Sequence, residues 1–143
     1  MEKKELELYI HIPFCVRKCN YCDFLSFPAD EDTQRQYVKA LCKEIFYYGA
    51  HCRDYVVSTV YIGGGTPSWL WESDMAEIMD AVHKNFALLP DAEVSVECNP
   101  GTVTAQKFAV YRQSGINRIS LGLQSAQNVE LKMLGRIHTW EQF

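Results

Sequence analysis

The chain has 143 residues, of which 48% are hydrophobic, and it carries a formal net charge of −4. This length is that of one domain and is enough to bury a sizeable core. Because no run of lysine or arginine exceeds two residues, the sequence gives no reason to expect a nucleic acid or an anionic membrane surface as a partner. The charged N-terminus lacks the apolar segment of a signal peptide, and no apolar run is as long as a membrane span, so we expect a cytoplasmic protein.

The first predicted element is a strand over residues 6–12, in which leucine and isoleucine alternate with polar residues. It runs directly into three cysteines with the spacing C-x3-C-x2-C, at Cys15, Cys19 and Cys22. A loop this short allows three thiolates to converge on one point, and thiolates are soft ligands that select zinc, copper(I) or iron–sulfur clusters.

The number of ligands separates these alternatives. A structural zinc site normally has four protein ligands, and no C-x2-C or H-x3-H pair occurs later in the chain. Three thiolates on a four-iron cluster would leave one iron open for a small molecule. The pattern therefore favours a 4Fe-4S cluster, with a zinc-stabilised structural module and chance packing of three thiols as the alternatives.

Two helices and a strand are predicted next. The segment Asp30-Glu-Asp-Thr33 is expected to supply the capping residues and first-turn acids of a helix of about four turns that ends near Gly49. A second strand over 56–62 stops at a triple glycine, and a second helix follows it. The apolar positions recur at helical spacing and predict the buried stripes. These are Val38, Leu41, Cys42, Ile45 and Phe46 in the first helix, and Met75, Ile78, Met79, Val82 and Phe86 in the second.

The rest of the chain repeats the strand–helix alternation. Four such units in succession indicate a parallel sheet with right-handed crossovers. The remaining predicted elements are a turn at 89–91, a third strand at 93–98, a helix at 104–114 stopped by Gly115, a fourth strand at 118–123, and a last helix capped by Ser125 that contains Leu131 and Leu134 and ends at Gly135.

The parity of the strands indicates how the sheet is covered. In every strand the polar residues share one face and the aliphatic residues share the other, whereas a sheet covered on both faces would show near-continuous apolar runs. We therefore predict an α/β fold with a curved parallel sheet, a partial (β/α) barrel of about four units, with its site at the C-terminal ends of the strands. The polar set comprises Tyr9, His11, Thr59, Tyr61, Gly63, Ser95, Glu97, Ser120, Gly122 and Gln124.

Two further features lie at strand ends. Glycines at 63–65, followed by Thr66, allow a backbone to approach a ligand closely, although a plain tight turn explains them equally well. By strand alternation, the Glu97 side chain is on the polar face that we predict to point inward, and it could accept hydrogen bonds from ribose hydroxyls. A solvated or ion-paired acid is the alternative. Cys42, Cys52 and Cys98 lie among apolar residues and are predicted to be core packing rather than ligands.

Five ordered motifs together carry a resemblance to a known family. The cysteine motif with its preceding Tyr9-Ile-His-Ile-Pro-Phe-Cys15 resembles the radical S-adenosylmethionine (SAM) superfamily and, within it, the oxygen-independent coproporphyrinogen III oxidase-like branch. The segment Cys22-Asp-Phe-Leu-Ser is most similar to the haem chaperones of that branch, the HemW type. The other four motifs are Gly63-Gly-Gly-Thr-Pro-Ser68, Glu97-Cys-Asn-Pro-Gly-Thr-Val103, the segment 115–125 and the segment 134–139.

The resemblance implies a set of cofactors and site residues. It implies that Cys15, Cys19 and Cys22 hold the cluster, that the open iron binds SAM, and that an electron from a donor such as a flavodoxin or ferredoxin cleaves SAM to methionine and a 5′-deoxyadenosyl radical. It assigns no catalytic side chain here. The positions that it places against SAM are Tyr9, Tyr21, Gly64, Gly65, Thr66 and Glu97, and those that match contacts to a second SAM in coproporphyrinogen-oxidising relatives are Gln124 and Arg136.

One position distinguishes the branches of the family. The oxidising enzymes resemble C-x3-C-x2-C-x-C, and Phe24 stands where the last cysteine would be. This departure favours the haem-chaperone branch, which binds haem and passes it to acceptor proteins, over a coproporphyrinogen III oxidase of porphyrin biosynthesis. The haem-binding segment of that branch would follow Phe143, so we expect the chain to be the N-terminal portion of a longer partial-barrel domain.

Overall fold

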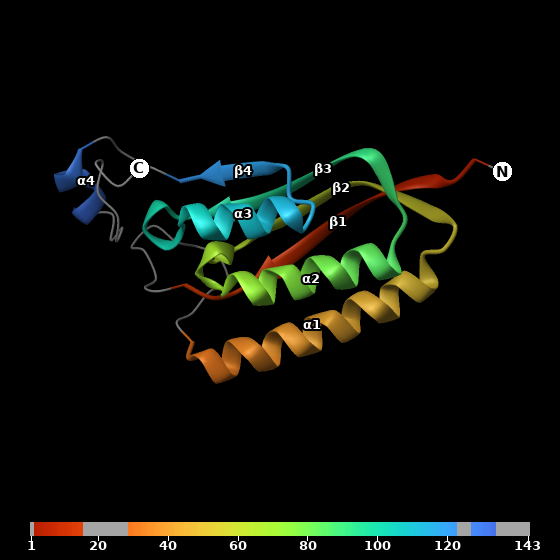
Figure 1. Ribbon diagram of the computed structural model, residues 1–143, viewed down its shortest axis with the longest axis horizontal. Coiled ribbons are helices and arrows are strands. Elements are labelled where there is room, and N and C mark those ends of the chain that lie inside the picture. Colours follow the sequence, from red (N-terminus) through yellow and green to blue (C-terminus); the bar gives the residue numbers. More distant parts are fainter. Residues whose placement is uncertain (1, 16–28, 123–126, 134–143) are drawn as a thin grey trace.

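The computed structural model describes residues 2–15, 29–122 and 127–133. It contains one sheet of four parallel strands in the order β1-β2-β3-β4 (Figure 1). The strands are β1 (Lys4–Ile12), β2 (Tyr55–Gly64), β3 (Leu88–Cys98) and β4 (Arg118–Leu121). The helices are α1 (Glu31–His51), α2 (Glu72–Asn85), α3 (Ala105–Gln113) and α4 (Asn128–Met133), with short 3-10 turns η1 (Pro67–Trp69) and η2 (Pro100–Thr102).

The strand order confirms the predicted partial barrel. Each strand pairs with the next strand along the chain, and α1 packs against α2 and α2 against α3, so these three helices form one layer beside the sheet. A sequential parallel order of this kind is that of a (β/α) barrel rather than of a doubly wound sheet. The C-terminal ends of the strands lie at one edge, on the left of Figure 1.

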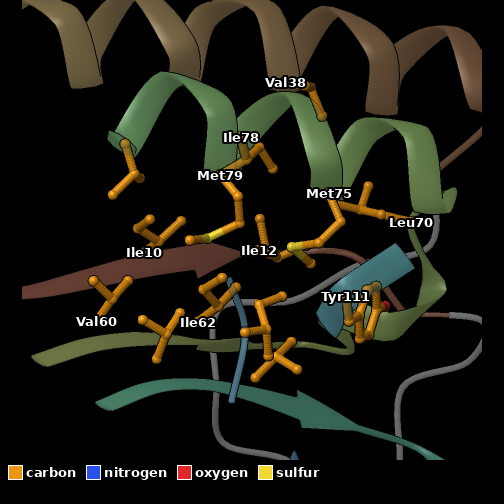
Figure 2. Close-up of a cluster of buried hydrophobic side chains, with 14 of the residues drawn as sticks. Ile10, Ile12, Val38, Val60, Ile62, Leu70, Met75, Ile78, Met79 and Tyr111 are labelled. Carbon is orange, nitrogen blue, oxygen red and sulfur yellow. The ribbon is translucent and has the colours of Figure 1, made fainter. Parts of the chain in front are cut away.

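The hydrophobic core lies between the sheet and α2, as Figure 2 shows. Ile10 and Ile12 of β1 and Val60 and Ile62 of β2 are 5% exposed or less, and they meet the buried stripe of α2. The members of that stripe are Met75, Ile78, Met79 and Val82, each with no exposed surface. Burial of one such side chain stabilises the fold by roughly 1.5–3 kcal/mol. The strand positions that face α2 are therefore the aliphatic ones, which explains why aliphatic and polar residues alternate.

The helix ends follow local capping chemistry. The Asp30 carboxylate accepts a hydrogen bond from the Thr33 amide (2.8 Å), and the Thr104 hydroxyl accepts one from the Lys107 amide (3.1 Å). Gly115 follows α3 with a φ of 94°, which favours glycine, so the predicted helix stop is confirmed.

The predicted length of the first helix was wrong, as was the burial of one member of its predicted stripe, Phe46, whereas Val38, Leu41, Cys42 and Ile45 pack in or against the core. α1 has 21 residues, about six turns, and continues through Gly49 to His51. Gly49 is buried against the end of α2, where a Cβ would lie 2.5 Å from the Asn85 carbonyl oxygen. The stripe is also narrower than predicted, because Phe46 is 66% exposed.

The third strand also begins earlier than predicted. Residues 89–91 do not turn, because β3 already starts at Leu88, which pairs with Val57 of β2. The register shifts between Val57 and Thr59, and such an irregularity tolerates the missing amide of Pro90. Phe86 follows the last residue of α2 instead of extending its stripe.

The C-terminal predictions are only partly covered by the structure. β4 is described to Leu121 and α4 buries Leu131, whereas positions 123–126 and 134–143, including the predicted cap Ser125, Leu134 and the predicted helix stop Gly135, lie outside the described residues. Among the described helices, none has both the length and the hydrophobicity that a bilayer crossing requires.

We predict that Gly49→Ala destabilises the protein by about 1–3 kcal/mol, because the added methyl group forces α1 away from α2. Helix propensity alone predicts the opposite, a gain of about 0.5–1 kcal/mol. Urea unfolding followed by circular dichroism measures the difference. Ala50→Gly at the exposed neighbouring position calibrates propensity in the same helix, and a raised unfolding midpoint for Gly49→Ala would contradict the packing role.

Candidate cofactor site

The candidate site begins where β1 and β2 end side by side. The Gly65 amide donates a hydrogen bond to the Ile12 carbonyl (2.8 Å), and the Thr66 amide donates one to the Phe14 carbonyl (2.6 Å). The segment that leads into Cys15 is therefore hydrogen-bonded to the backbone of the glycine loop. Cys15 itself is buried, with 6% of its surface exposed.

The glycines are required by this close contact. Gly64 has a φ of 122°, and a Cβ on it would lie 2.7 Å from the Ile12 carbonyl oxygen. A Cβ on Gly65 would lie 2.5 Å from the Phe14 carbonyl oxygen. Both distances are shorter than real Cβ contacts, so only glycine fits. The sequence predicted that these glycines let the backbone approach a ligand closely, and this stays a prediction. The close approach that the structure shows is to the segment that leads from β1 to Cys15.

Glu97 lies at the end of β3 with its carboxylate directed toward β2. One oxygen, Oε1, accepts a hydrogen bond from the Tyr61 hydroxyl (2.6 Å), and Oε2 accepts one from the Gly64 amide (3.1 Å). The hydrogen bond to Glu97, together with burial, raises the pKa of Tyr61 to about 12. The predicted inward parity of Glu97 is confirmed, and its carboxylate is attached to the same glycine loop as the Cys15 segment.

Aromatic side chains extend the polar face of the sheet. The Tyr9 ring is stacked on Tyr61, with the ring centroids 6.2 Å apart and the planes at 18°. The Tyr9 hydroxyl is hydrogen-bonded to His11 Nδ1 (2.9 Å). Tyr9 is 61% exposed, which leaves its ring accessible.

A buried polar cluster joins the loops that follow β2 and β3. The hydroxyls of Ser68 and Thr102 are hydrogen-bonded to each other, and Ser68 Oγ also accepts from the Asn99 amide (3.0 Å). The Lys107 ammonium donates to the carbonyls of Ser68 (2.6 Å) and Thr102 (2.9 Å), and burial lowers its pKa. This cluster holds the loop of Thr66 against the loop that follows Glu97.

Sequence analysis missed two contributors to this arrangement. Tyr61 was predicted only to lie on the polar face, and no partner was predicted for it. The available signal was its position two residues before Gly63, on the same side of β2. Lys107 lies outside the quoted motifs and gave no distinguishing pattern, because its contacts form only when α3 packs beside η1.

Cys98 and Cys42 behave as packing residues. Cys98 is buried beneath this cluster, and burial raises its pKa to about 12, which keeps it a neutral thiol. Cys42 is half-buried and packs against the core, whereas Cys52 is half-buried at the end of α1 and is not among the described residues that pack against the core.

The structure brings together six of the predicted site residues at this edge: Cys15, Tyr9, Gly64, Gly65, Thr66 and Glu97. The others, Cys19, Cys22, Tyr21, Gln124 and Arg136, lie outside the described residues, as does Phe24. The predicted convergence of three thiolates therefore stays a prediction.

The sequence matches the model of the radical SAM superfamily over residues 9–143. The chain belongs to this superfamily. It is 46% identical over 134 residues to the haem chaperone HemW of Escherichia coli, a match that covers 93% of this chain and 35% of the relative. It is 41% identical over 135 residues to HemW of Mycobacterium tuberculosis, with 92% and 35% covered.

Solved structures support the same fold. The radical SAM enzyme coproporphyrinogen III oxidase (HemN) from Escherichia coli superposes with a TM-score of 0.89 at 30% identity, over 99% of this chain and 32% of that one. The archaeal Elp3 of Methanocaldococcus infernus gives a TM-score of 0.53 at 14% identity, over 99% of this chain and 34% of that one, which shows shared fold alone. The chain thus spans about a third of the length of the relatives that it matches.

We predict that Lys107→Met lowers the free energy of unfolding by about 1–3 kcal/mol, because two loop carbonyls lose their shared donor. Urea unfolding measures this loss. Lys84→Met is the matched control, since it removes only an exposed pair with Asp80 and should change little. Equal effects of the two substitutions would contradict the clamping role of Lys107.

Proposed function

We propose that this chain is the cluster- and SAM-binding portion of a haem chaperone. In this proposal Cys15, Cys19 and Cys22 hold a 4Fe-4S cluster that leaves one iron open for SAM. The observation that carries the proposal is the attachment of the Cys15 segment and of Glu97 to the same glycine loop.

The described residues fit a bound SAM. Among the residues that the structure describes, each Glu97 oxygen accepts one hydrogen bond, which leaves a lone pair on each oxygen to accept from a ribose hydroxyl. The accessible ring of Tyr9 could border the ligand. Gly64, Gly65 and Thr66 are proposed to lie against SAM from the sequence motif. Tyr21, Gln124 and Arg136 complete the proposed set from the sequence, the last two toward a second SAM.

The roles of the chain itself are to bind, orient and exclude water. When bound, the cluster and SAM supply one-electron chemistry, with the electron provided by a flavodoxin or ferredoxin. The burial of Cys15 shields the metal side of the site, while Glu97 orients the nucleoside side. We assign no catalytic side chain.

Haem handling is proposed from the relatives and from one residue. The relatives named haem chaperones are 35% to 46% identical to this chain, and Phe24 replaces the cysteine expected in the oxidising branch. We propose that the whole protein binds haem and passes it to acceptor proteins. Thiolates that hold a cluster need a reducing compartment, so we place the protein in the cytoplasm.

A coproporphyrinogen III oxidase is the second candidate, because the structural match to HemN has a TM-score of 0.89. The full-length protein distinguishes the two functions. Turnover of coproporphyrinogen would favour the oxidase, whereas stoichiometric haem binding and transfer to an acceptor without turnover would favour the chaperone.

We predict that anaerobic reconstitution loads about four irons and four sulfides per chain. The electron paramagnetic resonance spectrum of the reduced sample should change when SAM is added, because SAM occupies the open iron. A variant with Cys15, Cys19 and Cys22 all replaced by alanine should load none.

The remaining thiols provide the control. Cys98→Ala removes one buried thiol and should leave the iron content unchanged. About one zinc without sulfide would instead indicate the structural module. Iron retained by the triple variant would contradict the assigned ligands.

A further inference from the structure

We infer that Tyr61 is a positioning residue that fixes the Glu97 carboxylate for binding the ribose of the adenosyl ligand. The inference rests on the proposed SAM site and adds a residue that neither the family motifs nor the comparisons assign. It follows from the contacts of β2 and β3, as given below.

The geometry fixes both ends of the carboxylate. Tyr61 is paired with Ser95, so Glu97 lies two positions farther along β3 and meets the Tyr61 hydroxyl diagonally across the strands. The 2.6 Å contact has the length of a charge-assisted hydrogen bond. With the Gly64 amide on the other oxygen, the carboxylate is held at two points from β2.

Loss of the hydroxyl would release one of these points. The terminal torsion of a glutamate side chain is broad and is restricted only by its partners. Of the two partners that the structure describes, only the Gly64 amide would then hold the carboxylate. The carboxylate could rotate about that bond, and the lone pairs left for the ribose would no longer point in one direction. The direction of the bond is also fixed, because a carboxylate only accepts and the Tyr61 phenol remains protonated at neutral pH.

Tyr61 also joins two parts of the proposed site. Its ring stacks on the exposed ring of Tyr9, while its hydroxyl holds Glu97. Tyr61 therefore lies between a residue proposed to border the ligand and the residue proposed to bind its ribose.

The core of the protein does not depend on the Tyr61 side chain. The aliphatic neighbours Val60 and Ile62 supply the core contacts of this part of β2, with 1% and 0% of their surface exposed. Tyr61 is half-buried on the opposite, polar face. Removal of its hydroxyl should therefore leave the core intact.

The test uses Tyr61→Phe, which removes the hydroxyl and keeps the ring stacked on Tyr9. The reconstituted protein is titrated anaerobically with S-adenosyl-L-homocysteine and with its 2′-deoxy and 3′-deoxy analogues, and calorimetry gives each dissociation constant. Glu97→Gln is measured in parallel. Tyr55→Phe is the matched control, because it removes a tyrosine hydroxyl at the opposite end of the same strand.

We expect Tyr61→Phe to weaken binding of S-adenosyl-L-homocysteine about 5- to 20-fold, with no change for Tyr55→Phe. The informative quantity is the coupling to the ribose hydroxyls. The wild type should bind at least one deoxy analogue more weakly than S-adenosyl-L-homocysteine itself. For Tyr61→Phe and Glu97→Gln the difference between the same two ligands should be much smaller, because the carboxylate that accepts from the ribose hydroxyl is already misplaced or weakened.

The outcomes separate this inference from the proposal on which it depends. Weaker binding by Glu97→Gln with wild-type binding by Tyr61→Phe would overturn the role of Tyr61 alone. If Tyr61→Phe weakened binding of S-adenosyl-L-homocysteine and of both deoxy analogues by the same factor relative to the wild type, the effect would be a general structural one. That result would also overturn the role of Tyr61. Unchanged binding in both variants would remove Glu97 from the site, and the inference would fall with that assignment.

Discussion

The close contact between the end of β1 and the glycine loop after β2 is the constraint on which the rest of the site depends. Two backbone amides, from Gly65 and Thr66, reach carbonyls on either side of Pro13. Any side chain larger than hydrogen at Gly64 or Gly65 would collide with those carbonyls. The segment that enters the cysteine motif is therefore held by backbone hydrogen bonds to the neighbouring unit, a restraint that needs no metal.

Glu97 extends this restraint to the third strand. Its carboxylate receives the Gly64 amide and the Tyr61 hydroxyl, so β1, β2 and β3 meet through one loop. The cluster of Ser68, Thr102 and Lys107 holds the following loops together from the helix side. Both faces of the sheet thus contribute: the aliphatic face supplies the core, and the polar face presents the acid and the stacked tyrosines.

Much of the fold could be predicted because local chemistry and periodicity agree with it. Strand alternation in β1 and β2, the cap supplied by residues 30–33, and the glycine after α3 each depend on nearby residues. The wrong predictions concern residues whose roles depend on contacts with distant parts of the chain. Gly49 resembles a helix stop, yet it is a contact between two helices, and Pro90 resembles a turn, yet it lies in a strand whose partner has an irregular register.

The sequence by itself determined the family, the cysteine motif and the face on which Glu97 lies, because these depend on spacing and on strand parity. Only the tertiary structure decided that Tyr61 holds Glu97, that Lys107 clamps two loops, and that the glycines accommodate the neighbouring strand. Those contacts join residues 36 and 39 positions apart, from different strand–helix units. No local pattern encodes such pairs, because they form only when the parallel strands align in register and the helices pack beside them.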